Sequence, residues 1–208
     1  MEQVVKVGLI GFGTVGTGVV KILQRNAEII ARRVGRSVVL AKIADLDITT
    51  DRGVTVSPDM LTTNANDILD DPQIDIVVEL IGGHEPAKRF ILHALSKQKG
   101  VVTANKALLA DHGEEVFEAA FQAKADLGFE ASVGGGIPII RSLTEGLAGN
   151  RLTSITGIMN GTSNYILTRM TLEGRDFSDI LKEATREGYA EADPSLDIEG
   201  IDAAHKLT

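Results

Sequence analysis

Five acidic side chains and a lysine form a dense group of ionisable residues near the end of the chain: Glu191, Asp193, Asp197, Glu199 and Asp202, then Lys206. Asp202 and Lys206 are four residues apart, so on a helix they share one face and can form an ion pair. Gly200 and the acids before it suit the start of such a helix. A lysine that a carboxylate holds at a loop-to-helix junction could donate a proton to a reacting group. The alternative is a solvated acidic loop with one ordinary surface pair. Spacing alone favours this alternative, because structural ion pairs outnumber catalytic ones.

Three glycines near the start of the chain, Gly11, Gly13 and Gly16, have the spacing of a phosphate-binding turn. They follow a β-branched apolar run at 4–10 and precede a helical pattern, as a dinucleotide-binding turn requires. Gly11 would allow the tight turn, Gly13 the close approach of the pyrophosphate, and Gly16 the packing of helix against strand. The start of the helix would attract the phosphate charge. A glycine turn in another kind of α/β protein is the alternative.

The apolar pattern predicts the scaffold that positions these residues. Short apolar runs typical of buried parallel strands alternate with helical patterns. The predicted strands cover 4–10, 38–44, 74–81 and 101–103, and the predicted helices cover 15–33, 65–69, 86–97 and 113–124. This alternation predicts an α/β fold with a doubly wound parallel sheet. With the glycine turn, it predicts a Rossmann-type dinucleotide-binding domain over residues 1–129.

The pattern changes near residue 130, where we place the start of a second, α+β domain over residues 130–208. Strand-like runs at 129–133 and 152–159 alternate with helical patterns at 138–147, 162–172 and 178–187. No flexible linker marks the boundary between the two predicted domains.

Composition limits the class of protein. The chain has 208 residues and a formal net charge of −8, without a lysine or arginine cluster that would bind nucleic acid. It has no cysteine, which excludes disulfides, thiolate catalysis and cysteine-bound metals. The start of the chain does not resemble a signal peptide, and no apolar run is long enough to span a bilayer. We therefore expect a cytoplasmic protein that acts on a small molecule, without nucleic-acid or membrane partners.

Histidine chemistry is not expected. The four histidines form neither a metal-binding spacing nor a triad with a nucleophilic serine: His84, His93, His112 and His205. We interpret all four as structural or solvated.

The residues from Ala184 to Lys206 resemble the signature of homoserine dehydrogenases at every defining position. The matching residues are Ala184, Gly188-Tyr189-Ala190, Asp193-Pro194, Asp197-Ile198, Gly200, Asp202 and Lys206. The resemblance extends in the family's order through 157–167, Thr103-Ala104-Asn105-Lys106 and the glycine turn, so it covers the whole chain. Homoserine dehydrogenases interconvert L-aspartate 4-semialdehyde and L-homoserine with a nicotinamide cofactor, in threonine, methionine and isoleucine biosynthesis.

The resemblance implies a set of cofactor-binding residues: Gly11, Phe12, Gly13, Thr14, Val15, Gly16, Thr103, Lys106 and Gly188, with Thr103 on the nicotinamide side. Asp45 ends the second predicted strand, where an acid usually holds the adenosine ribose. Many family members carry an arginine just before this aspartate for the 2′-phosphate of NADP, but here the residue is Ala44. We therefore favour NAD over NADP, with Lys42 and Arg52 as nearby cations that could still support NADP.

The resemblance also implies the catalytic groups. Lys206 would donate a proton to the developing alkoxide when the aldehyde is reduced. Lys106 would orient or polarise the substrate, although its position alone indicates only a surface lysine at a helix start. Asp197 and Asp202 would orient Lys206 and bind substrate. Glu191 would hold the substrate amino group, and Gly188 would also line the substrate site.

A loop rich in glycine could bind a cation. By resemblance, Glu130, Val133, Gly135 and Ile137 would hold Na⁺ or K⁺, mainly through main-chain oxygens, as hard cations prefer. A plain strand-to-helix connection is the alternative. Glu79 ends a buried strand beside Gly82-Gly83, and the sequence assigns it no role.

The chain ends inside a helical pattern, whereas family members continue. We therefore interpret it as the first part of a longer enzyme that is a homodimer. One alternative is a reductase for another amino-acid semialdehyde. The other is a dinucleotide-binding module without turnover, if the substrate site is incomplete. Phosphorylating semialdehyde dehydrogenases are excluded, because they need a thiolate.

Overall fold

The computed structural model describes residues 4–191 and 193–208, which divide into two compact units, Met1–Arg141 (unit 1) and Ser142–Thr208 (unit 2). The expected absence of a signal peptide rests partly on residues 1–3, which lie outside the described residues. The units divide after residue 141, whereas we place the domain boundary after residue 129 from the sequence.

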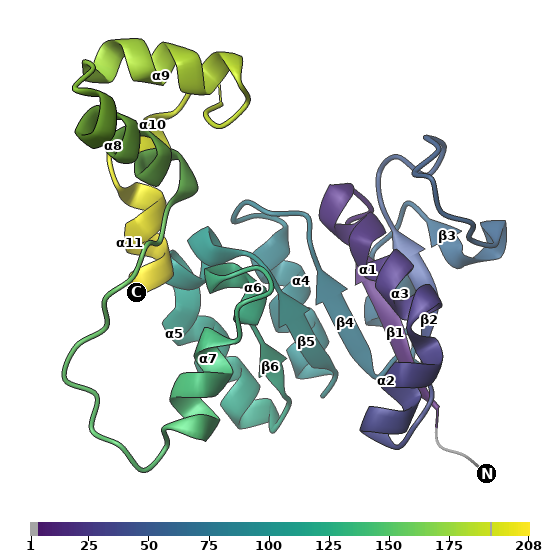
Figure 1. The fold of residues 1–208 in the computed structure, drawn as a ribbon. Helices are drawn as coiled ribbons and strands as arrows, with labels where there is room; N and C mark the ends of the chain where they lie inside the picture. The colour runs from purple at the N-terminus through teal and green to yellow at the C-terminus, as the bar shows by residue number, and fades with distance from the viewer. Residues whose placement is uncertain (1–3, 192) are drawn as a thin grey trace. The chain divides into compact units, whose positions relative to one another are not determined.

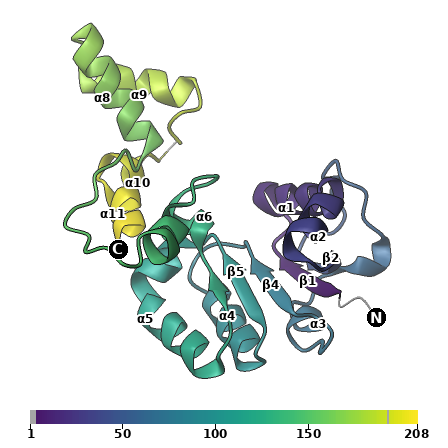
Figure 2. The same cartoon turned by 60° about the horizontal axis from the view of Figure 1, so that its bottom comes forward.

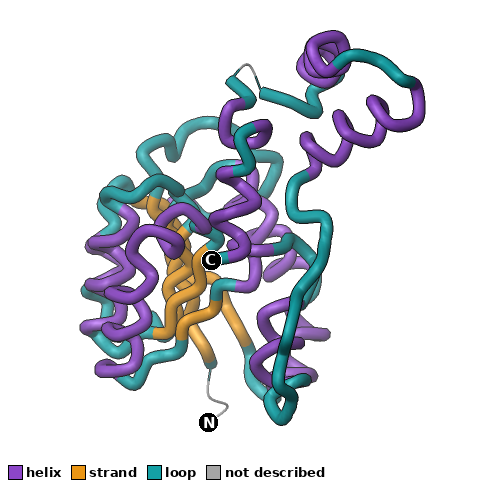
Figure 3. The backbone as a smooth tube through the Cα atoms, turned by 90° about the vertical axis from the view of Figure 1, so that its left-hand side faces the viewer, coloured by secondary structure: helices purple, strands orange, loops and turns teal. Residues whose placement is uncertain are grey.

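Unit 1 contains one parallel sheet, whose strands lie side by side (Figures 1 and 3). The strands are β1 (Val5–Ile10), β2 (Val38–Ala44), β3 (Leu61–Thr62), β4 (Ile76–Glu79), β5 (Gly100–Thr103) and β6 (Leu127–Gly128). Their order across the sheet is β3-β2-β1-β4-β5-β6. The chain first adds β2 and β3 on one side of β1 and then adds β4, β5 and β6 on the other side, so the strand order reverses between β1 and β4. Ligands of such sheets bind beside the carboxyl ends of the strands at this reversal. The predicted Rossmann-type fold class is confirmed.

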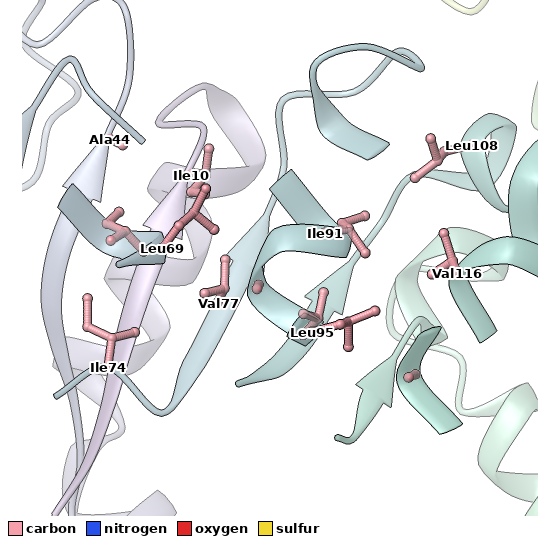
Figure 4. Packing of buried hydrophobic residues seen from close by; sticks show 13 residues of the cluster. Ile10, Ala44, Leu69, Ile74, Val77, Ile91, Leu95, Leu108 and Val116 are labelled. Atoms are coloured by element: carbon pink, nitrogen blue, oxygen red, sulfur yellow. The ribbon is translucent and has the colours of Figure 1, made fainter. Parts of the chain in front are cut away.

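Helices cover both faces of this sheet (Figure 2). The helices of unit 1 are α1 (Thr14–Arg25), α2 (Ala27–Val34), the short η1 (Pro58–Met60), α3 (Asn66–Leu69), α4 (Ala87–Ser96), α5 (Lys106–Ala123), α6 (Glu130–Val133) and α7 (Ile139–Arg141). Neighbouring strand residues point to opposite faces, so Leu9 packs in the cluster with Val20 of α1, and Ile10 packs in the cluster with Ile91 of α4 (Figure 4). Both faces are therefore buried, as parallel sheets require.

Two predicted helices differ from those in the structure. The predicted helix at 15–33 is two helices, because Asn26 ends α1 and its carbonyl accepts from Ile30 at the start of α2. Asparagine favours helix ends over interiors. The helix predicted from 113 begins at Lys106, where the Asn105 side chain accepts from the Leu108 N–H, and it bends at His112.

The predicted strand at 129–133 is wrong. Residues 130–133 form α6, because the Phe129 carbonyl accepts from Ser132 N–H and the Glu130 carbonyl accepts from Gly134 N–H. These local turns replace pairing with a neighbouring strand.

Unit 2 is helical in its described part. It contains η2 (Ser142–Gly146), α8 (Gly161–Glu173), α9 (Phe177–Arg186), α10 (Ser195–Ile198) and α11 (Ile201–Leu207). α8 and α9 pack around Ile166, Ile180 and Ala184. The strand predicted at 152–159 is wrong, because this segment has no regular structure. The described residues of unit 2 offer no second strand for it to pair with, and a strand is stable only with partners.

Membrane crossing can be tested on the described helices. Among the residues that the structure describes, no helix is both long enough and apolar enough to cross a bilayer.

Candidate functional site

The glycine turn joins β1 to α1, and its three glycines have different surroundings. Gly11 has φ +103°, and a Cβ on it would lie 2.7 Å from the Leu80 carbonyl carbon. A Cβ on Gly16 would lie 2.0 Å from the Gly11 oxygen. A Cβ on Gly13 would meet nothing within 4 Å. Gly11 and Gly16 are thus required by the fold, whereas Gly13 faces open space where a ligand can approach the backbone.

The start of α1 suits an anion. Its N-cap residue, Gly13, provides no side-chain cap, and the first turn carries no acidic residue. Thr14 and Val15 are exposed there, whereas Phe12 is buried in the core and can offer only its backbone. Free N–H groups at a helix start attract phosphate. The residues present therefore fit the pyrophosphate of a dinucleotide.

Asp45 connects the end of β2 to the glycine turn. Its Oδ2 accepts a hydrogen bond from the Phe12 N–H at 2.5 Å, and its Oδ1 accepts from the Asp47 N–H at 2.8 Å. The Arg52 guanidinium lies 4.0 Å from Oδ1 and donates to Asp47 at 3.2 Å. Hydrogen bonds from Thr50 and Thr49 hold the pKa of Asp47 well below its usual range. Asp47 therefore favours its ionised form, and its ion pair holds Arg52 beside Asp45.

A cavity of about 500 Å³ lies at the carboxyl ends of β1, β2 and β4, where the strand order reverses. Its lining includes Gly11, Gly13, Asp45, Leu80, Ile81 and Gly82. The cavity combines apolar walls with the open face of the glycine turn and two acidic residues, Asp45 and Glu85. This arrangement can hold an adenosine and its phosphates.

Two other predicted residues lie at the end of β5 and shortly after it. Thr103 is completely buried, and its hydroxyl donates to Glu79 at 2.8 Å. Lys106 is the first residue of α5 and is partly buried. Asn105, which we did not predict, is the N-cap of α5 and donates to the Gly83 carbonyl at 2.6 Å.

The predicted cation loop comprises α6 and the connection from α6 to α7. Both carboxylate oxygens of Glu130 accept main-chain N–H groups, from Ile140 at 2.7 Å and from Arg141 at 3.1 Å. The Ile137 carbonyl accepts from Ile139 at 2.9 Å. The Glu130 side chain thus stabilises the start of α7. Within the described residues, no three histidine, aspartate or glutamate side chains form a metal-binding group.

In unit 2, Asp202 and Lys206 form the predicted pair on α11, with Nζ 2.7 Å from Oδ2 (α11 is labelled in Figure 1). Lys206 also donates to the Met159 carbonyl at 2.7 Å. Asp202 is buried, and the Lys206 side chain is about one-fifth exposed (22%). The amine is therefore held in place by two hydrogen bonds, and the side chain that carries it is partly exposed.

Asn160 joins the two predicted substrate carboxylates. Its Nδ2 donates to Asp197 Oδ1 at 2.7 Å and to Asp202 Oδ2 at 2.9 Å. Its Oδ1 accepts the Ser163 N–H at the start of α8. Thr162 donates to the other oxygen of Asp197 at 2.8 Å. We did not predict these two residues as site residues, and only the helix-capping position of Asn160 is visible in the sequence.

These side chains line an open cavity of about 690 Å³. The lining residues are Asn160, Gly161, Thr162, Asn164, Tyr165, Thr168, Arg169, Gly188, Tyr189, Asp197, Asp202 and Lys206. Gly188 adopts φ +80° in the turn after α9. Glu191 is exposed and is not part of this lining. The structure thus brings Gly188, Asp197, Asp202 and Lys206 together, as the resemblance implies.

An ion-pair network adjoins this cavity through Tyr165 and Arg169, which line it. Glu183 accepts from Arg169, from Arg175 at 2.7 Å and from the Tyr165 hydroxyl at 3.0 Å. These hydrogen bonds lower the pKa of Glu183 to about 2, and the bond from Arg175 contributes most. Burial and donation to Glu183 and Glu187 raise the pKa of Tyr165 to about 12. Tyr165 stacks on Tyr189 with ring centroids 4.5 Å apart.

Two family models match the chain. The model for "Homoserine dehydrogenase, NAD binding domain" matches residues 11–130, and the model for "Homoserine dehydrogenase" matches residues 138–208. The homoserine dehydrogenase of Pseudomonas aeruginosa is 50% identical over 204 residues, covering 98% of this chain and 46% of that protein. That of Bacillus subtilis is 47% identical over 205 residues, covering 99% of this chain and 47% of that protein. The chain spans about half the length of the curated relatives it matches.

Solved structures agree with these matches. A homoserine dehydrogenase from Thiobacillus denitrificans superposes with a TM-score of 0.92 at 51% identity, covering 100% of this chain and 48% of that one. A hyperthermophilic archaeal homoserine dehydrogenase in complex with NADPH superposes with a TM-score of 0.83 at 28% identity, covering 98% of this chain and 67% of that one. The resemblance seen in the sequence is confirmed, and the chain belongs to the homoserine dehydrogenase family.

Proposed function

We propose that this chain is part of an enzyme that reversibly reduces L-aspartate 4-semialdehyde to L-homoserine with NAD(H) or NADP(H), in threonine, methionine and isoleucine biosynthesis. The observation that carries the proposal is the Lys206 amine, which Asp202 holds beside an open polar cavity. Support for the cofactor comes from the glycine turn of unit 1 and from the NADPH complex of the archaeal relative.

The bound nicotinamide would supply the hydride in reduction and accept it in oxidation. Gly11, Gly13, Gly16 and the start of α1 would hold the pyrophosphate, and Asp45 the adenosine ribose. Phe12, Thr14, Val15, Thr103, Lys106 and Gly188 complete the proposed cofactor set. Our preference is NAD, because Ala44 provides no cation for a 2′-phosphate.

Lys206 would act as the proton donor in reduction. A lysine side chain is ordinarily protonated at neutral pH, so donation to the developing alkoxide needs no change of charge state beforehand. Oxidation of homoserine needs the neutral amine, so its rate should rise into alkaline pH. Asp202 and Asp197 would orient the amine and bind substrate, and Asn160 donates to both carboxylates.

Other groups would bind substrate. Glu191 would hold the substrate amino group, and Lys106 would orient or polarise the aldehyde. A Na⁺ or K⁺ ion at Glu130, Val133, Gly135 and Ile137 also belongs to the proposal. So do a homodimeric full-length enzyme, a cytoplasmic location, and the absence of nucleic-acid and membrane partners.

The experiment is an assay of the full-length enzyme from which this chain derives. NADH oxidation is measured with aspartate semialdehyde and, in parallel, with homologous amino-acid semialdehydes. We expect turnover with aspartate semialdehyde to exceed that with the homologues. Preference for a homologue would show another semialdehyde reductase. Tight NADH binding without any turnover would show a dinucleotide-binding module.

A further inference from the structure

Glu79 is a buried carboxylate to which the proposed chemistry gives no role. It is the last residue of β4 and has no exposed surface. A glutamate is almost never fully buried unless it has partners. Its Oε1 accepts the N–H groups of Ile81 at 2.8 Å and Gly82 at 3.3 Å, and its Oε2 accepts the Thr103 hydroxyl at 2.8 Å.

These bonds belong to a closed circuit between the loops that follow β4 and β5. The Thr103 hydroxyl oxygen accepts the Asn105 N–H at 3.1 Å, and the Asn105 amide donates to the Gly83 carbonyl at 2.6 Å. Gly82 and Gly83 have φ of +72° and +69°, so only glycine lets the first loop curl around Glu79 at low cost. We call Glu79, Thr103, Asn105 and the 81–83 main chain the Glu79 circuit.

The Glu79 circuit touches both parts of the proposed cofactor site in unit 1. Ile81 and Gly82 line the cavity at the reversal of strand order, opposite the glycine turn. The loop packs so closely on this turn that a Cβ on Gly11 would lie 3.0 Å from the Ile81 nitrogen. At its other end, Asn105 caps α5, whose first residue is Lys106. One carboxylate therefore fixes a cavity wall and the start of α5 together.

We propose that Glu79 is a positioning residue for dinucleotide binding. Its hydrogen bonds fix the 81–83 loop, and the position of this loop sets the width of the cavity that would hold the cofactor. They also hold the segment that leads to Lys106. This inference rests on the proposed dinucleotide binding. A carboxylate is suited to the position because its oxygens only accept hydrogen bonds, and all three groups that face it donate.

Glu79→Gln tests the proposal with little change of volume. The glutamine amide has one acceptor oxygen and one NH₂ group, so either the Thr103 hydroxyl or the main-chain N–H groups of Ile81 and Gly82 would face a donor in place of an acceptor. Thr103→Val opens the bond between Glu79 and Thr103 from the other side, whereas Thr103→Ser keeps the hydroxyl. Glu114→Gln is the matched control, since it removes the same charge from an exposed position on α5.

NADH binding to the 208-residue chain is measured by fluorescence titration, at a temperature where circular dichroism shows each variant folded. We expect Glu79→Gln and Thr103→Val to raise the Kd for NADH about tenfold, the loss of one hydrogen bond to a charged group. Glu114→Gln should stay within about twofold of wild type, and Thr103→Ser, which keeps the hydroxyl, should lose less affinity than Thr103→Val. The double variant Glu79→Gln, Thr103→Val should have a Kd for NADH close to that of either single variant, because both substitutions disrupt the same contact.

Wild-type NADH affinity in folded Glu79→Gln would overturn the inference and leave the proposed function intact. If Glu79→Gln does not fold, unchanged affinity in folded Thr103→Val overturns the inference instead. Absence of NADH binding by the wild-type chain would contradict the proposed function as well, which separates the two failures.

Discussion

The amide nitrogen of Asn160 donates a hydrogen bond of 2.9 Å to Oδ2 of Asp202. The same oxygen accepts from the Lys206 amine at 2.7 Å. Asp202 is therefore fixed from two sides, and Lys206 depends on a residue from the start of another helix. Asn160 also holds Asp197, so one amide separates two carboxylates that would otherwise repel each other.

Asn160 caps α8 and donates hydrogen bonds to two carboxylates, and Asn160→Asp tests these two roles separately. Aspartate caps a helix as well as asparagine does, so α8 should keep its start. It cannot donate to Asp197 and Asp202, and it adds a third negative charge beside them. We expect kcat of the full-length enzyme to fall at least about tenfold, because a hydrogen bond to a charged group contributes ~1.5–3 kcal/mol. Unchanged kcat with an unchanged circular dichroism spectrum would show that the amide does not position Lys206.

The glycine turn predicts opposite results for two alanine variants. Gly16→Ala places a Cβ 2.0 Å from the Gly11 oxygen, so it should destabilise the chain by about 1–3 kcal/mol, as overpacking does. Gly13→Ala meets no protein atom within 4 Å, so stability should change little while NADH binding weakens. Denaturant unfolding and NADH titration of both variants test this contrast. Equal loss of stability in both would contradict it.

The Glu183 network predicts acid sensitivity in unit 2. The pKa of Glu183 is lowered from 4.5 to about 2, so its ionised form stabilises the fold above pH 4.5. That contribution is lost as the pH falls from 4.5 to about 2. Glu183→Gln should make stability less dependent on pH in this window. The chain has two tyrosines and no tryptophan, and Tyr165 and Tyr189 both lie in unit 2, so their near-ultraviolet circular dichroism reports this unit. An equally steep acid transition in Glu183→Gln would exclude the network as its cause.

Arg52 is one of the two nearby cations that could support NADP. It lies 4.0 Å from Asp45 and is fixed by Asp47. Ala44 is buried in the core and supplies no charge. We therefore expect Arg52→Gln to weaken NADPH binding about tenfold and NADH binding much less, because only NADPH carries the extra phosphate. The same two binding measurements on Lys42→Gln test the second nearby cation. Equal effects of Arg52→Gln on both cofactors would place the 2′-phosphate elsewhere.

The sequence predicts those parts of the site that depend on neighbours along the chain. The glycine turn lies within six residues, and Asp202 and Lys206 are one helical turn apart, so motif spacing predicts the turn and the contact of the pair. The role of the pair comes from the family resemblance, since spacing alone favours an ordinary surface ion pair. Glu79 and Thr103 are 24 residues apart, and Asn160 lies 37 and 42 residues from its two carboxylates. No local pattern encodes such contacts, because they depend on which strands and helices become neighbours.

The same reasoning explains the errors in the fold. The run at 152–159 has the β-branched composition of a strand, but a strand also needs a partner, which composition does not reveal. Alternation of strands and helices predicts the parallel fold and the four longer strands of unit 1, since short parallel connections leave few possible arrangements. It does not predict β3 and β6, because strands of two residues are too short to show a pattern.

The central claim is that Lys206 is the proton donor, and Lys206→Met in the full-length enzyme tests it most directly. Methionine keeps the length and apolar stem but cannot transfer a proton. Lys182→Met, an exposed lysine on α9, is the matched control. We expect Lys206→Met to lose most turnover, by about 10²–10⁴-fold as for other general acids, with NADH affinity near that of wild type. Turnover of Lys206→Met equal to that of wild type and Lys182→Met would contradict the account.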